Sequence, residues 1–101
     1  PPAPPSSLAA IATNQINFAG TESVLDRPNQ LRFARWNLSA GKDAADRSNF
    51  QAALFYYKYG IAFLGDRLWI EDCHQLCYEL HEGLASAFFA IGDHTLALQK
   101  A

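Results

Sequence analysis

An excess of basic residues is absent from this sequence. Its 101 residues carry 8 Lys and Arg against 10 Asp and Glu, which gives a formal net charge of −2 and a pI near 5.8. Nucleic acids attract proteins through basic patches or stripes. We therefore expect no nucleic-acid partner.

A long apolar run is missing as well. No uninterrupted apolar stretch approaches the roughly 18 to 20 residues that cross a bilayer. The first residues also lack the charged region followed by an apolar stretch that is typical of a secretory signal. We expect a soluble chain with no direct membrane insertion.

Cysteine is scarce. Cys73 and Cys77 lie four residues apart in a segment that the pattern below predicts to be helical, and a disulfide between them would distort that helix. Two thiols that do not pair favour a reducing compartment. We expect an intracellular, cytoplasmic location, and an organelle stays open as the alternative.

Hydrophobic residues make up half of the chain, enough for one modest core but not for two. Residues 1–7 (PPAPPSS) are proline-rich and predict a linker or tail. Residues 8–101 are expected to form a helical repeat segment that is a piece of a longer array.

Periodicity and stop signals predict the helices. A short helix is expected over Leu8–Phe18, and Asp26 with Pro28 starts a second that runs to about Arg47. Its apolar positions recur at steps of three and four: Leu31, Ala34, Leu38, Gly41 and Ala45.

A third helix is predicted from a capping box formed by Ser48 and Gln51, with Gly65 as its stop. The residues expected to point inward are Phe50, Ala53, Leu54, Tyr57, Ile61 and Leu64.

The next predicted helix follows the turn at 65–67 and ends at Gly92, after which Asp93 caps a last helix that is cut off at Ala101. Its buried stripe is expected to contain Trp69, Cys73, Leu76, Leu80, Leu84, Ala87 and Ile91. The fold class is therefore all-α, with antiparallel helix–turn–helix pairs and no strand.

Small and aromatic residues recur in two segments in a way that resembles the tetratricopeptide consensus. Small residues let helices approach closely and aromatic rings fill the space beside them. The residues expected to pack the repeats are Gly41, Ala53, Tyr57, Gly60, Trp69, Leu84, Ala85, Phe88, Gly92 and Ala97.

A narrower resemblance follows from the order of several short blocks. Asn14–Asn17, the stretch from Asp26 to Leu38, Ala40–Lys42, Gly60–Leu64, Trp69 and Tyr78–Glu82 resemble the repeat region that follows the ATPase module in MalT-like activators and in ATPase-containing serine/threonine and histidine kinases. This resemblance implies a scaffold or sensor segment that contacts other proteins, neighbouring repeats or domains, with ATP binding left to another module.

Three motifs resemble part of a catalytic or ligand-binding site, and each is incomplete. Gly41-Lys42 lacks the earlier glycine and the following hydroxyl of a phosphate-binding loop, and His81-Glu82 lacks the second histidine of a zinc-protease helix. Cys73, Cys77 and His81 span about 12 Å along a helix, too far for all three to ligate one zinc ion. We expect no catalytic residue, cofactor, metal or small-molecule substrate, and no enzyme.

The aromatic residues between Phe55 and Phe63 are more numerous than one helix face can bury. They either pack against a neighbouring repeat or form an exposed groove. The residues predicted to contact a partner are Tyr56, Tyr59 and Phe63.

Charge is also unevenly spread, with basic residues between 27 and 47 and acidic residues between 71 and 93. These form two solvated faces, or two patches of opposite sign that orient a partner. The expected function is a non-catalytic protein–protein interaction segment of an ATPase-associated signalling protein. The alternative is a small helical structural subunit that clamps a larger assembly.

Overall fold

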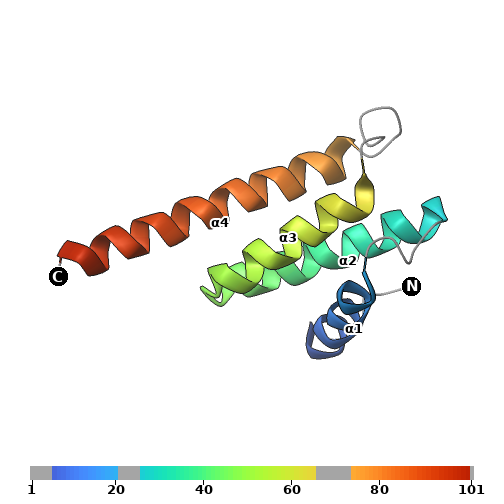
Figure 1. Ribbon diagram of the computed structural model, residues 1–101, viewed down its shortest axis with the longest axis horizontal. Coiled ribbons are helices and arrows are strands. Elements are labelled where there is room, and N and C mark those ends of the chain that lie inside the picture. Colours follow the sequence, from blue (N-terminus) through green and yellow to red (C-terminus); the bar gives the residue numbers. More distant parts are fainter. Residues whose placement is uncertain (1–5, 21–25, 66–73, 101) are drawn as a thin grey trace.

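The protein is described by a computed structural model that covers residues 6–20, 26–65 and 74–100, with backbone alone described at 6–10 and 94–100. Its helices are α1 (Ser6–Ala19), α2 (Arg27–Asp46), α3 (Phe50–Leu64) and α4 (His74–Lys100) (Figure 1). Within these ranges there is no strand. The all-α expectation is confirmed, and α1 begins at Ser6, two residues before the expected boundary.

The first turn of α2 follows the predicted start signal. Asp26 is the N-cap in an extended conformation, and its carboxylate accepts a hydrogen bond from the amide of Asn29 at 3.2 Å. Pro28 lies in the first turn, where its missing amide has no intrahelical partner. Arg27 is the first residue of α2, and its Nη1 donates to the carbonyl oxygen of Leu64 at 2.7 Å. This hydrogen bond joins the start of α2 to the end of α3.

The start of α3 differs from the prediction by one residue. Ser48 has a φ of 62° and lies in the left-handed region, so it turns the chain between the two helices. Asn49 is the N-cap, and its side chain accepts from the amide of Ala52 at 3.3 Å. The expected capping box of Ser48 and Gln51 is therefore wrong. Gly65, with a φ of 71°, ends the helix as predicted.

The predicted break at Gly92 is also wrong, because α4 runs without interruption from His74 to Lys100. Gly92 and Asp93 lie inside the helix and are exposed, and no truncated last helix follows. Glycine costs only about 1 kcal/mol in a helix interior, and the Leu, Ala, Gln and Lys residues that follow favour helix enough to offset it. Trp69 and Cys73 lie outside the described residues.

The core lies around α3, which packs between α2 and α4 (Figure 1). Ala34, Leu38 and Gly41 of the expected α2 stripe are buried, and Leu31 and Ala45 border the core. In α3 the buried residues are Ala53, Tyr57, Gly60, Phe63 and Leu64. The predicted inward residues Phe50, Leu54 and Ile61 are half-buried.

Tyr57 lies in a slot between two glycines. A Cβ at Gly41 of α2 would lie 2.5 Å from Cε1 of Tyr57, and a Cβ at Gly83 of α4 would lie 2.6 Å from its Cζ. A Cβ at Gly60 would likewise meet Leu80 Cδ2 at 2.5 Å. Glycine at these positions lets the three helices approach more closely than any other residue would allow.

The remaining repeat-packing residues divide into three groups. Leu84 is half-buried and packs against the core. Ala85, Phe88 and Gly92 are exposed, so they do not pack against the other described helices, and their packing against a neighbouring repeat stays a prediction. They follow Leu84, Ala87 and Ile91 of the predicted stripe by one residue each, which turns them about 100° away from that stripe. Trp69 and the side chain of Ala97 are outside the described residues.

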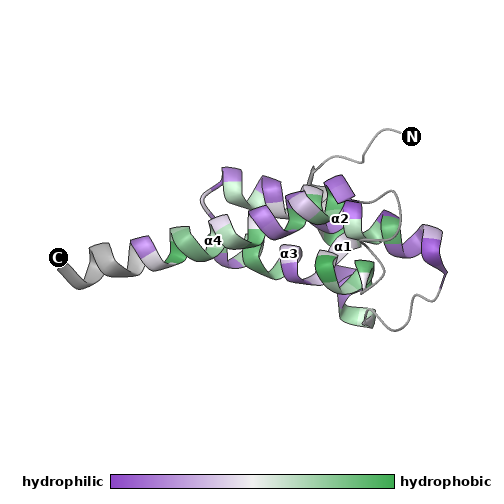
Figure 2. Cartoon of the chain, turned by 90° about the horizontal axis from the view of Figure 1, so that it is seen from above, coloured by the Kyte–Doolittle hydropathy of each residue, from purple (hydrophilic) through white to green (hydrophobic). Residues whose placement is uncertain are grey.

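Facing pairs fix the antiparallel register of α3 and α4. Gly60 faces Leu80 and Tyr57 faces Gly83, so Phe50 at the start of α3 faces about residue 90 of α4. The last part of α4 therefore extends past the end of α3. Figures 1 and 2 both show this helix projecting at the C-terminal side.

Polar contacts attach α1 to the other helices. The side-chain amides of Asn17 and Asn37 exchange two hydrogen bonds, of 2.8 and 3.0 Å, and both residues are buried. The hydroxyl of Tyr56 on α3 donates to Asn14 Oδ1 at 2.9 Å. These contacts place α1 beside both α2 and α3.

Candidate functional site: an aromatic face on α1, α3 and α4

The three residues predicted to contact a partner have different surroundings. Phe63 is only 2% exposed and meets the ring of Phe33 edge-on at 5.8 Å, so it belongs to the core and is not available to a partner. Phe63 follows the buried Gly60 by three residues, which places it on the same inward row. Tyr56 is half-buried by its contact with α1.

Tyr59 is half-buried and stacks on Phe55, with ring centroids 5.5 Å apart and an interplanar angle of 19°. Phe55 itself is 62% exposed. Phe55 borders a hollow together with Phe18 of α1, which is 93% exposed, and the nearby Lys58 reaches the ring of Phe88 of α4, which is 52% exposed. We call the surface formed by Phe18, Phe55, Tyr59 and Phe88 the aromatic face.

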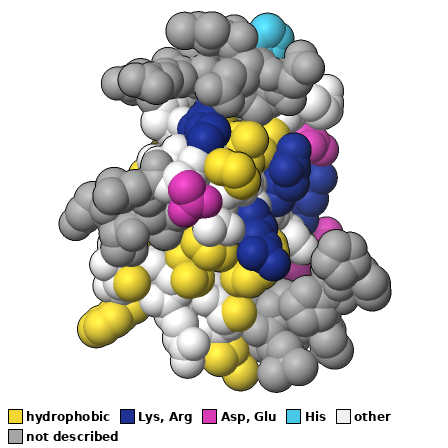
Figure 3. Space-filling view, turned by 90° about the vertical axis from the view of Figure 1, so that its right-hand side faces the viewer, with side chains coloured by type: hydrophobic (Ala, Val, Ile, Leu, Met, Phe, Trp, Pro, Cys, Tyr) yellow, Lys and Arg dark blue, Asp and Glu magenta, His cyan; other side chains and the backbone are white. Residues whose placement is uncertain are grey.

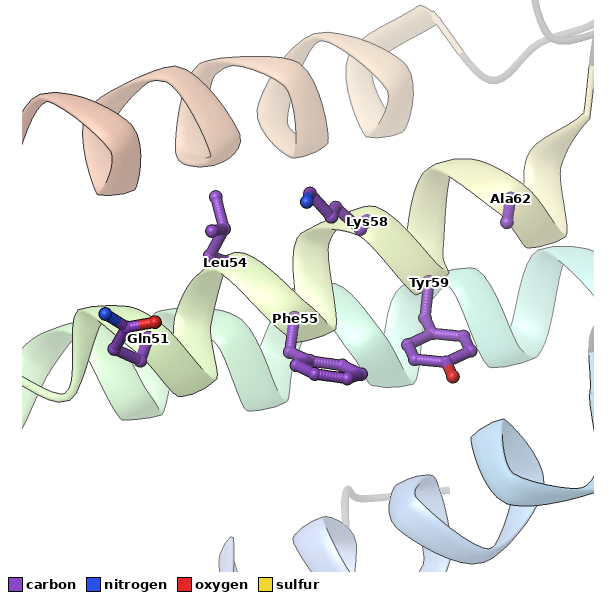
Figure 4. Close-up of a pocket in the computed structure, with 6 residues that line it drawn as sticks. All are labelled: Gln51, Leu54, Phe55, Lys58, Tyr59 and Ala62. Carbon is purple, nitrogen blue, oxygen red and sulfur yellow. The ribbon is translucent and has the colours of Figure 1, made fainter. Parts of the chain in front are cut away.

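Two hollows lie on this face, on either side of the stacked rings of Phe55 and Tyr59. The first, of about 440 Å³, is lined by Gln51, Leu54, Phe55, Lys58, Tyr59 and Ala62. In Figure 4 Leu54 and Lys58 point toward α4, whereas Phe55 and Tyr59 point toward α1. The second hollow, of about 430 Å³, lies between α1 and α3 and is bordered by Phe18.

Charge is nearly absent from the two helices that form most of the aromatic face. The 14 residues of α1 carry none, and the 15 residues of α3 carry only Lys58. The ammonium group of Lys58 lies 5.6 Å from the ring centroid of Phe88, so it is directed along the face toward α4. Among the described side chains in Figure 3, the lower part of the molecule, where α1 lies, is hydrophobic or uncharged.

The charged side chains of α2 and α4 gather elsewhere. Lys42 and Glu79 form a salt bridge of 2.9 Å across these helices, and Arg47 pairs with Asp43 at 3.4 Å within α2. Burial raises the pKa of Tyr57 above its usual value of 10.0, and the negative charge of Asp46 raises it further. One basic residue of the segment 27–47 and one acidic residue of the segment 71–93 therefore pair with each other, at Lys42 and Glu79.

The residues of the three incomplete motifs lie in the core or on the surface of a helix where the structure describes them. Gly41 is buried against Tyr57 in the middle of α2, not in a loop. Cys77 is buried in the core and His81 is exposed, while Cys73 lies outside the described residues. Across the described side chains, no three His, Cys, Asp or Glu residues gather as they would around a metal ion.

Several residues of this surface could not be predicted from sequence periodicity. Phe18 and Phe55 were expected to belong to a short helix and to a crowded aromatic segment, without a role of their own. The signal that distinguishes them is the lack of charge along both helices, which is visible in the sequence. The position of α1, which brings Phe18 beside Phe55, depends on the buried Asn17–Asn37 pair and has no local signal.

Comparisons with protein-family models, with curated proteins and with solved structures found no match.

Proposed function

We propose that this chain is a non-catalytic segment that binds other proteins through the aromatic face. The observation that carries the proposal is the near absence of charge on α1 and α3. A helix that lies at a solvated surface normally has a polar outward side, and one that is apolar all round is normally buried. Here the exposed side of α3 presents Phe55, with the half-buried Tyr59 stacked on it.

The residue types support a protein partner. Interfaces are enriched in aromatic residues and depleted of charge at their centre, and aromatic side chains in well-packed pockets supply much of the binding energy. Phe18 and Phe55, which border one hollow, are 93% and 62% exposed, and contiguous exposed apolar patches mark protein interaction sites. The hollows beside Phe55 and Tyr59 offer room for side chains of another protein.

A membrane surface is the second apolar environment that such a face could meet. Helices that lie on membranes combine an apolar side with a polar side rich in Lys and Arg. The polar positions of α1 and α3 are occupied by Ser, Thr, Asn and Gln, with Lys58 as the one basic residue. Among the described residues no helix is long and apolar enough to span a bilayer. The face therefore fits a protein better.

The wider role that we propose is that of a tetratricopeptide-like repeat segment in an ATPase-associated signalling protein, as the sequence blocks suggest. The close approach of helices at Gly41, Gly60 and Gly83 supports a repeat-like packing. The exposed side of α4 at Ala85 and Phe88 is where a neighbouring repeat would stack. A small structural subunit of a larger assembly would use the aromatic face in the same way.

Site-specific photo-crosslinking tests the proposal. Phe55 is replaced by p-benzoylphenylalanine in the chain produced in its native cells, and Ser39, exposed on the opposite charged side of α2, is replaced in a matched control. We expect a discrete protein adduct from position 55 that is absent or much weaker from position 39. Equal labelling from both positions, or none from position 55, would overturn the proposed function.

A further inference from the structure

We infer that a polar hollow between α2 and α4 binds a guanidinium group, the charged end of an arginine side chain. The hollow has a volume of about 450 Å³. It shares no lining residue with the two hollows of the aromatic face, so this inference goes beyond the proposed function and does not rest on it. Its polar lining residues include Lys42 and Asp46 of α2, Tyr57 of α3, and Tyr78, Glu79 and Glu82 of α4.

The hydroxyl group of Tyr57 reaches this hollow from the core. An added Cβ would lie 2.9 Å from Tyr57 Cζ at Gly41 and 2.6 Å from it at Gly83, and Cζ is the carbon that carries the hydroxyl. The side chain is only 4% exposed, and its hydroxyl forms no hydrogen bond with any of the described residues. Polar groups in such surroundings are normally hydrogen-bonded. The hydroxyl is therefore available to a group that enters the hollow.

Negative charge prevails around this hydroxyl. The carboxylates of Asp46, Glu79 and Glu82 line the hollow together with the ammonium group of Lys42. Lys42 and Glu79 pair with each other at 2.9 Å, whereas Asp46 has no ion-pair partner among the described residues. Burial raises the pKa of Tyr57 and the charge of Asp46 raises it further, so these two groups lie close together. The hollow therefore favours a cation.

The spacing of the acceptors favours a planar organic cation over a metal ion. Across the described side chains, no three His, Cys, Asp or Glu residues gather around one point. A guanidinium group holds five N–H donors in a rigid fork, so it can bind one carboxylate with two of them and donate a third to another acceptor. Asp46 supplies the carboxylate and the Tyr57 oxygen the other acceptor. Tyr78, which is 60% exposed, adds a ring on which the guanidinium plane can stack.

Titration of the purified chain with acetyl-arginine amide, followed by NMR of the isotope-labelled protein, tests this inference. We expect saturable shifts of the backbone amides at Asp46, Gly83 and Ser86, which line the hollow. Acetyl-citrulline amide has nearly the same shape but no charge. It should bind about tenfold more weakly, because it cannot form charge-assisted hydrogen bonds.

Three variants connect the binding to the hollow. Asp46→Asn keeps the shape of an exposed side chain and should weaken acetyl-arginine amide about tenfold through loss of the charge. Tyr57→Phe keeps the ring and should weaken it about fivefold through loss of one hydrogen bond. Asp43→Asn is the matched control, because Asp43 also belongs to α2 but pairs with Arg47 and does not line the hollow. Circular dichroism checks that each variant keeps its helical content.

Two further probes distinguish the sources of the guanidinium group. Tighter binding of a peptide with one arginine between alanines assigns the site to a partner protein, and tighter binding of propylguanidinium assigns it to a free guanidinium compound. Either result supports the site. Equal binding of the arginine and citrulline compounds, no binding of either, or equal weakening by Asp43→Asn and Asp46→Asn would overturn it.

Discussion

Gly83 and Tyr57 are in contact across α3 and α4, so that a Cβ at position 83 would lie 2.6 Å from Cζ of the ring. An aromatic ring held between two helices cannot move aside as a flexible side-chain end could. The space at Gly83 is therefore filled by its neighbour, whereas Gly92 on the same helix has nothing within 4 Å of its added Cβ.

Alanine at these two glycines should have opposite effects. In the open helix position, Gly92→Ala should stabilise the protein by up to about 1 kcal/mol through helix propensity. Gly83→Ala should destabilise it by about 1 to 3 kcal/mol, because the added methyl group overpacks the slot. Urea denaturation of both variants measures the difference. Two stabilising substitutions would show that Tyr57 is not confined as described.

The buried amide pair of Asn17 and Asn37 should show strong coupling. Asn37→Ala removes the partner of the buried Asn17 amide, and Asn17→Ala does the reverse, so each should cost about 1 to 3 kcal/mol. The double variant should cost clearly less than the two single costs together. A double-mutant cycle by chemical denaturation measures the coupling energy, and simple additivity would mean that the two amides do not exchange hydrogen bonds.

Stability should fall at alkaline pH through Tyr57. Its pKa is raised in the folded state, chiefly by burial and further by Asp46, so the neutral phenol is favoured there over the phenolate. The resulting stabilisation is fully present below the usual pKa of 10.0 and is lost as the pH rises through the higher folded-state value.

Tyr57→Phe isolates that contribution, because phenylalanine keeps the ring but does not titrate. The free energy of unfolding of this variant should decline less steeply above pH 10 than that of the unmodified chain. Thermal denaturation across a pH series provides the comparison. Parallel curves would indicate that groups other than Tyr57 account for the alkaline loss.

The salt bridge between Lys42 and Glu79 should contribute little to stability. Its side chains are 55% and 32% exposed, and solvated pairs of this kind contribute at most about 1 kcal/mol. Lys42→Glu should therefore lower the melting temperature slightly at low salt and less at high salt. The charge-reversed pair, Lys42→Glu with Glu79→Lys, should restore most of the loss, and a loss that ignores salt would point to packing instead.

Sequence signals located the helices where local chemistry decides the outcome. Asp26 with Pro28 and Gly65 act within one turn of the chain, so their effects can be predicted from neighbouring residues alone. Gly92 failed as a stop because a glycine ends a helix only when the following residues do not continue it. Ser48 failed as a cap because Asn49, an equally good capping residue, lies next to it.

The aromatic face could be predicted only in part. Tyr59 and the crowded aromatic segment were visible in the sequence, but which rings are buried depends on the angle at which α1 and α4 meet α3. Phe63 turned inward because it shares a row with Gly60, and Phe55 turned outward. Asn17 and Asn37 are polar residues on buried rows, and nothing local shows that they would meet each other.

Tyr57 also governs how the protein unfolds. Each helix packs chiefly against the next one in the chain, so folding closes only short loops and should be fast. Two neighbouring hairpins, α2 with α3 and α3 with α4, could in principle melt separately. Tyr57 belongs to both hairpins, because its ring is enclosed only when Gly41 of α2 and Gly83 of α4 are both packed against it. Loss of either outer helix opens the same slot, which makes the two hairpins cooperate in one transition.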